Sequence, residues 1–244
     1  MMRKTHSFSN TTSKNKKDEP ENRMKITASV INDISKDDNP VWKFSLSAGE
    51  NVLDNALDIL QHVPILEEIC IFSNDPELNA SEKYQGIVVQ PFDQRLAYNF
   101  NFLDNLKLHN ECFTLQKTGS LGDIHLFLDI HYPLLQAASL LRMFHSLMEN
   151  RFASKVIPVY SIDPHLYLEI PGNDQYLNLW GQQGLDRQQH PPLFRAVGCC
   201  FIHCGRLQGM QPLTFPFNIN QVEGFKLSSK ADTNFVDYVM KNQQ

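Results

Sequence analysis

The sequence lacks the features that mark several large classes of protein. Its formal net charge is −5, so it has no excess of basic residues that would attract nucleic acid or an anionic membrane surface. No apolar run is long enough to cross a bilayer, and no apolar segment follows the basic residues near the N-terminus. We therefore expect a cytoplasmic protein with neither a nucleic-acid partner nor a membrane partner.

Cysteine and histidine are present without the spacing of a metal site. The five cysteines are odd in number, and Cys199, Cys200 and Cys204 fall in or just after one apolar segment. Thiols in such a segment usually serve as small core residues, so we expect them to be reduced. The nine histidines show no His-x-x-x-His pattern, and the chain has no Walker loop or Gly-x-Ser-x-Gly elbow.

The chain divides into a polar N-terminal segment and a region of alternating strands and helices. Residues 1–23 are rich in Ser, Thr, Asn and Lys, which predicts a disordered tail, and residues 24–244 form the predicted domain. The expected strands are Met24–Ile31, Glu68–Phe72, Gly86–Val89, Ile124–Ile130, Lys155–Ser161, Ala196–His203 and Phe225–Ser228; the expected helices are Val52–Leu60, Leu134–Asn150 and Lys230–Met240. This alternation indicates a single-domain α/β fold with a mostly parallel sheet flanked by helices.

The loop after the first strand is a weak candidate for a phosphate site. It carries Ser35, Lys36 and Lys43, but it also carries three aspartates and no glycine. A phosphate cradle needs a close approach by backbone N–H groups, and an uncompensated carboxylate there repels the anion. The alternative is a solvated loop of mixed charge.

Asp129 and His131 follow the strand Ile124–Ile130 and lie two residues apart at its end. Side chains with this spacing project to the same side of a strand and could hold a divalent ion. One carboxylate and one imidazole suit manganese or zinc better than magnesium, with His165 or His203 as a third ligand. Alternatively, Asp129 caps the next helix, or His131 is a partly buried residue with a structural role.

The run Asp186–Gly198 combines a guanidinium, two amides and a rigid Pro-Pro corner immediately before a buried strand. Arg187, Gln188 and Gln189 are the candidate ligand contacts, because such groups converge in sites for polar ligands. The alternative is a surface loop closed by Pro191-Pro192.

Several segments together resemble the CMP-sugar synthetases, the cytidylyltransferases of acylneuraminate, pseudaminate and KDO. The resemblance runs from Met24 to the end of the chain and is carried by segments that occur in the family's order. These are Leu46–Gly49 with the helix Asn51–Leu60, Ile69–Asp75, Leu128–Leu134, Lys155–His165, the run Asp186–Gly198, and Gly224–Val239. It implies a fold of the nucleotide-diphospho-sugar transferase type, a GT-A-like Rossmann fold.

The resemblance also implies an activity and a set of roles. The family transfers a cytidylyl group from CTP to an acidic sugar with the help of Mg²⁺, and a homodimer is the expected assembly. In that scheme Ser35, Lys36 and Lys43 contact the nucleotide, with Lys36 catalytic. Arg187 is also catalytic and holds the sugar with Gln188 and Gln189.

The chain departs from the family pattern on the nucleotide and metal side. The family's Arg-Gly-Gly is replaced by Asn32-Asp33-Ile34, and its two metal-binding aspartates correspond to Lys226 and Ser228. A cation in place of an acid removes a ligand and adds repulsion, which argues against Mg²⁺ and leaves Mn²⁺ or no metal.

Three accounts follow from this pattern. The first is a nucleotidyltransferase in which Asp129 and His131 replace the usual metal site. The second is a non-catalytic relative that binds a sugar, a nucleotide or a partner protein. The third is a GT-A-type glycosyltransferase with an Asp-x-His metal motif.

Overall fold

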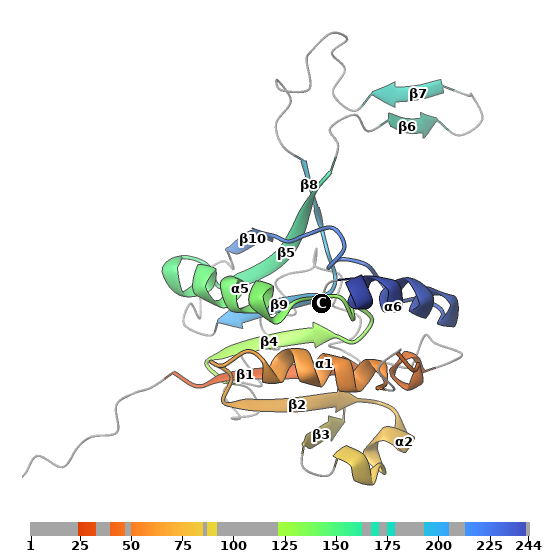
Figure 1. Ribbon diagram of the computed structural model, residues 1–244. Coiled ribbons are helices and arrows are strands. Elements are labelled where there is room, and N and C mark those ends of the chain that lie inside the picture. The colour runs from red at the N-terminus through yellow and green to blue at the C-terminus, as the bar shows by residue number, and fades with distance from the viewer. Residues whose placement is uncertain are drawn as a thin grey trace, which may run out of the picture.

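An eight-stranded mixed sheet forms the centre of the protein (Figure 1). The computed structural model describes residues 24–32, 40–46, 50–84, 87–91, 122–162, 167–170, 175–178, 193–204 and 213–242. The sheet contains β1 (Ile26–Asn32), β2 (Glu68–Ser73), β3 (Val88–Pro91), β4 (Ile124–Asp129), β5 (Lys155–Ile162), β8 (Leu193–Ala196), β9 (Cys200–Cys204) and β10 (Thr214–Asn218). A separate hairpin joins β6 (Tyr167–Ile170) to β7 (Gln175–Asn178), away from the sheet in Figure 1.

The strand order is β10-β5-β9-β4-β1-β2-β3, with β8 also paired to β5. Four pairings are parallel: β1 with β2, β1 with β4, β2 with β3, and β5 with β10. Strand β9 runs antiparallel to both of its neighbours, and β8 runs antiparallel to β5. The predicted α/β class is confirmed, and the sheet is mixed because of these two strands.

Two long helices that connect strands of the sheet, α1 (Val52–Gln61) and α5 (Ala137–Glu149), cover one of its faces. The described residues also form the helices α2 (Pro76–Asn79) and α6 (Thr233–Asn242) and short 3₁₀ turns at Val41–Lys43, Glu82–Tyr84 and Lys230–Asp232. Buried leucines of α1 and α5 pack on the alternating residues Ala28, Val30 and Leu126 of the central strands. This packing is the apolar core that the helical periodicity predicts.

The other face of the central strands is also buried and combines the aromatic residues Phe127 and Phe201 with a set of polar side chains. The His125 ring lies between the hydroxyls of Thr27 and Ser29, with oxygen to ring-nitrogen distances of 2.6 Å on both sides. The Ser29 hydroxyl is also 3.0 Å from the thiol of Cys70 in β2. Through these bonds His125 links β4 to β1, and Ser29 continues the chain of contacts to β2.

Several predicted elements differ from the observed ones. The predicted strand Ala196–His203 is two strands, because the chain turns at Val197–Cys199 and β8 then pairs only with β5. Phe225–Ser228 forms no ladder, so that predicted strand is wrong, and the strand β10 was not predicted.

The remaining sequence predictions concern the cysteines, the membrane and the chain ends. Four cysteines are buried free thiols, as expected: Cys70, Cys199, Cys200 and Cys204. Within the described ranges, no helix has the length and apolarity that a bilayer crossing requires. The predicted tail, residues 1–23, lies outside the described residues, so the domain boundary stays a prediction.

Candidate functional site

The parallel strands end at one edge of the sheet, called here the carboxyl edge. The chain builds β2 and β3 on one side of β1 and then places β4 on the other side, so the connections change direction between β1 and β4. Open α/β sheets bind their ligands outside the carboxyl ends of the strands at such a point. The turn after β4 therefore lies where a ligand is expected.

Asp129 and His131 contact one another in this turn. One Asp129 carboxylate oxygen accepts from the His131 backbone N–H at 2.9 Å and lies 2.6 Å from Nδ1 of the same residue. The side chains are only 24% and 13% exposed, respectively. The Asp129 carboxylate thus fixes the orientation of the His131 ring. The two side chains bind one another, whereas the predicted metal site requires both to bind the same ion.

The segment before α6 packs directly against this turn. The Leu227 N–H donates to the His131 carbonyl oxygen at 2.7 Å, and the Leu227 side chain is fully buried. Lys226 and Ser228, which flank Leu227, are consequently held beside the Asp129–His131 turn. Residues about a hundred positions apart in the sequence therefore meet here.

A pocket of ≈ 560 Å³ opens beside this contact. Its walls come from the turn after β4, from β5, from β8 with the turn that follows it, from the segment 221–226, and from α6. The lining residues are Tyr132, Tyr160, Arg195, Ala196, Val197, Gly198, Gln221, Val222, Gly224, Phe225, Lys226 and Phe235. We call it the Arg195–Lys226 pocket after the two cationic residues in this lining; none of the described lining residues is acidic.

The electrostatics of the pocket are set by its cations and by burial. Burial raises the pKa of the Tyr132 phenol well above its ordinary value, the Asp129 charge adds to this, and the Arg195 charge opposes it. Tyr132 is therefore a neutral hydroxyl at physiological pH. Phe225 and Phe235 lie with ring centroids 4.6 Å apart and give the pocket an aromatic wall.

On the β1–β3 side of the carboxyl edge, Lys43 is already engaged. Its ammonium forms an ion pair with Glu77 and lies 5.2 Å from the centroid of the Trp42 ring. The Trp42 indole N–H in turn donates to Asp75 at 2.7 Å. Lys43 is the only one of the three predicted nucleotide contacts inside the described residues; Ser35 and Lys36 lie outside them.

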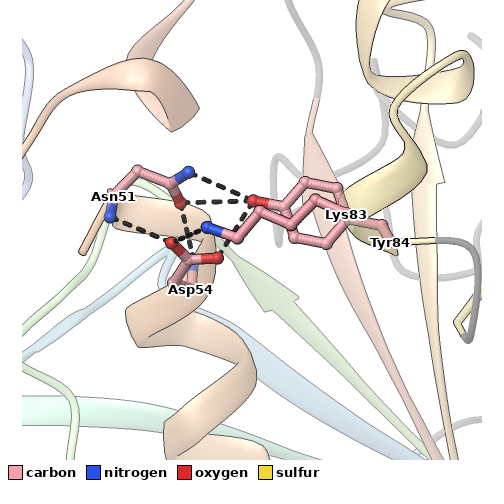
Figure 2. Close-up of polar contacts among 4 residues, drawn as sticks. All are labelled: Asn51, Asp54, Lys83 and Tyr84. Carbon is pink, nitrogen blue, oxygen red and sulfur yellow. Dashed lines mark hydrogen bonds and ion pairs between the residues drawn. The ribbon is translucent and has the colours of Figure 1, made fainter.

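The N-terminus of α1 is closed by a cluster of four residues (Figure 2). The Asn51 side chain caps the helix by accepting from the Asp54 N–H at 2.8 Å, and Asp54 accepts from the Asn51 N–H at 3.1 Å. Asp54 also accepts from Tyr84 at 3.0 Å and from Lys83 at 2.5 Å. Burial acts to raise the pKa of Asp54, but the bonds from Lys83, Asn51 and Tyr84 hold it below its ordinary value. A carboxylate thus occupies the helix end that an anion would otherwise favour.

The predicted metal site finds no third ligand where the structure describes the chain. No group of three His, Cys, Asp or Glu residues that could hold an ion occurs among the described residues. His203 pairs with His125, four positions before Asp129 in β4, which places it roughly 13 Å from the turn. As a third ligand His203 is therefore wrong, while His165 lies outside the described residues.

The predicted sugar contacts Arg187, Gln188 and Gln189 also lie outside the described residues. The same sequence run does reach the site, because it includes β8 and the turn after it and brings Arg195 into the pocket. Sequence reasoning missed Arg195, and it missed Tyr160 and Phe235 as well. The available signal was that Arg195 falls in the run already selected for its polar character.

Solved structures of cytidylyltransferases share this architecture. CMP:2-keto-3-deoxy-manno-octonic acid synthetase complexed with CTP superposes with a TM-score of 0.60 at 9% identity, over 90% of this chain and 100% of that one. The chain has a cytidylyltransferase fold. The 4-diphosphocytidyl-2C-methyl-D-erythritol synthase of Anaerococcus prevotii gives 0.58 at 10% identity, covering 89% and 99% of the two chains.

Another 4-diphosphocytidyl-2C-methyl-D-erythritol synthase structure gives a TM-score of 0.59 at 15% identity, with the same coverage of 89% and 99%. By sequence, neither a model of a known protein family nor a curated protein matches the chain. The relationship is therefore one of fold, and the function has to be argued from the site.

Proposed function

We propose that this protein is a cytidylyltransferase that joins the CMP part of CTP to an acidic sugar. In this reaction a sugar hydroxyl oxygen attacks the α-phosphorus of CTP, the bond to the β-phosphate breaks, and diphosphate leaves. The observation that carries the proposal is the Arg195–Lys226 pocket, which combines two cations with aromatic walls at the carboxyl edge of a cytidylyltransferase fold.

The pocket suits an acidic sugar in size and in chemistry. Its volume of ≈ 560 Å³ lies within the range of small-molecule sites. A guanidinium binds a carboxylate through two parallel N–H donors, which gives Arg195 the role of the principal anion contact. The hydroxyls of Tyr132 and Tyr160 can exchange hydrogen bonds with sugar hydroxyls, and Phe225 can pack on the apolar face of the ring.

The other contacts are part of the same proposal. Arg187, with a catalytic role, and Gln188 and Gln189 extend the sugar site. Ser35, Lys36 and Lys43 receive the nucleotide, with Lys36 contacting the phosphates. Lys43 must leave Glu77 to do so, because an ammonium neutralised by a carboxylate attracts phosphate weakly.

A second candidate function is favoured by specific residues. Lys226 lies beside the Asp129–His131 turn, and Lys43 is held by Glu77, so both the metal side and the phosphate side depart from what CTP requires. A non-catalytic relative that binds an acidic sugar or its CMP conjugate would keep the pocket and lose the transfer reaction. The glycosyltransferase account is weaker, since Asp129 is engaged with His131.

The test is an assay of diphosphate release from CTP by the full chain. N-acetylneuraminate, pseudaminate and KDO are supplied in turn as acceptors, each with Mg²⁺, with Mn²⁺ and with EDTA. Release that depends on one acceptor is the expected result. Sugar binding by calorimetry without release supports the non-catalytic relative, and the absence of both overturns the proposal. Ultracentrifugation of the same sample tests the predicted homodimer.

A further inference from the structure

The residues beside the pocket do not fit a divalent cation. Mg²⁺ prefers six oxygen ligands in a regular octahedron and is usually held by one or two carboxylates. The only carboxylate in the turn belongs to Asp129, and one of its oxygens is already taken by the N–H and the ring of His131. Lys226 lies one residue from the Leu227–His131 bond, so a cationic residue and not an acidic one adjoins the turn.

Lys226 and Arg195 remain available to a ligand. Both residues are exposed and line the pocket, and no acidic residue is among the described residues of its walls. Neither side chain forms an ion pair with a carboxylate anywhere in the described part of the chain. The pocket therefore presents two positive charges that form no ion pair with the surrounding described residues.

We infer that the Arg195–Lys226 pocket binds its anionic ligand without a divalent cation, the Lys226 ammonium supplying the positive charge that a metal ion would otherwise provide. The inference rests on the proposed function and adds the class of ligand. Two cations match a ligand with two negative charges, and a CMP-linked sugar acid has two, one on its carboxylate and one on its phosphodiester. The pocket thus favours the CMP conjugate over the free sugar acid.

The test is calorimetric titration of the full chain with CMP-N-acetylneuraminate, N-acetylneuraminate, KDO and CMP. Each ligand is titrated once in EDTA and once in excess Mg²⁺. We expect the CMP-linked sugar to bind at least tenfold more tightly than the free sugar, with dissociation constants in the two buffers that agree within about twofold. Binding in Mg²⁺ alone overturns the inference and leaves the proposed function standing. Binding of none of the four compounds overturns both.

Variants of Lys226 make the test specific. Lys226→Met should weaken binding of the CMP conjugate about tenfold or more in both buffers, because a charge-assisted contact is lost. Lys226→Arg should restore most of the loss. Lys226→Asp should bind weakly in EDTA and partly recover in Mg²⁺, because it replaces the ammonium with a metal ligand. Lys241→Met, on the exposed last turn of α6 and outside the pocket, is the matched control.

Equal binding by wild type and Lys226→Met in EDTA would overturn the inference. Thermal unfolding of each variant shows whether it is folded. Lys226 is exposed and makes no described side-chain bond, so these substitutions should leave the melting temperature within about 2 °C of wild type.

Discussion

The carboxyl edge of the sheet carries positive charge in two different ways. In the half formed by β1 to β3, Lys43 and Lys83 are each held by a carboxylate, from Glu77 and Asp54. In the half formed by β4 to β10, Arg195 and Lys226 line a pocket whose described walls contain no acidic residue. Oppositely charged side chains that pair at the surface largely neutralise one another. Whether each cation has a carboxylate partner therefore says more about anion binding than the number of cations does. The β4–β10 half is therefore the better anion site.

The two halves are joined through the pairing of β1 with β4. His125 of β4 lies between Thr27 and Ser29 of β1, and Ser29 continues the contact to Cys70 of β2. We call this contact between β1 and β4 the junction.

The largest effect should come from acidifying the junction. Burial lowers the pKa of His125 to about 3, with a further contribution from His203, whereas in the unfolded chain it titrates near its ordinary value of 6.5. Below pH 6.5 the unfolded chain therefore binds the extra proton and the folded chain does not. The free energy of unfolding should fall as the pH drops from 6.5 toward 3, by roughly 4 kcal/mol from this residue.

Urea unfolding of wild type and His125→Gln at pH 7, 5.5 and 4 checks this prediction. The variant should be less stable than wild type at pH 7. Because glutamine does not titrate, the variant should lose less stability than wild type on acidification. Equal losses in the two proteins would show that His125 is not responsible.

A second substitution tests the packing at the same junction. Gly122 donates its N–H to Thr27 Oγ1 at 2.9 Å, and an added Cβ would lie 2.7 Å from the Lys25 carbonyl oxygen and 2.8 Å from Thr27 Oγ1. Because one of these atoms is backbone, the strand itself must shift. Gly122→Ala should lower the free energy of unfolding by about 2 kcal/mol.

The matched control for that substitution is Gly224→Ala in the pocket wall. There the nearest atoms are the Val197 methyl carbons at 3.3 Å, which can yield by a small side-chain movement. It should cost less than about 1 kcal/mol. Urea denaturation of both variants measures the difference, and an equal cost would contradict the geometry.

Sequence reasoning predicted much of the fold because most elements have strong local patterns. Strands such as β1 and β4 are apolar runs, and α5 shows clear helical periodicity. The boundary between β8 and β9 was missed because the apolar run continues through the turn at Gly198, although a glycine inside a strand pattern is itself a break signal. β10 was missed because Pro216 argues against a strand, yet proline is tolerated at a sheet edge.

The candidate site divides in the same way between local and long-range features. The Asp129–His131 pair could be predicted because two residues at a strand end are neighbours in any fold. Arg195 could not be assigned, since its place depends on β8 pairing with β5, which lies more than thirty residues earlier in the chain. Phe235 enters the pocket only through the packing of α6.

The third prediction compares the two halves directly. Arg195→Met should weaken binding of the CMP-linked sugar acid by about ten- to a hundredfold, because a charged hydrogen bond to a carboxylate is lost. Lys83→Met removes a cation that Asp54 already holds and that is no part of the proposed ligand contacts, so it should change the same affinity less than about twofold. Calorimetric titration measures both. A larger loss in Lys83→Met than in Arg195→Met would reverse the assignment of the two halves.

The smallest effect should come from the cap of α1 in the β1–β3 half. Asn51→Ala removes the oxygen that accepts from the Asp54 N–H and the amide that donates to the Tyr84 hydroxyl at 3.1 Å. An N-cap replaced by alanine costs about 1 kcal/mol, whereas Asn51→Ser keeps a cap oxygen and should recover most of it. Because Asp54 retains Lys83 and Tyr84, the negative charge at this helix end persists, and the affinity for the CMP-linked sugar acid should stay unchanged. Thermal unfolding and titration of the two variants measure the two quantities separately. A cap variant that alters ligand affinity without changing stability would place the N-terminus of α1 itself in the ligand site, and this helix end would then no longer differ from the pocket.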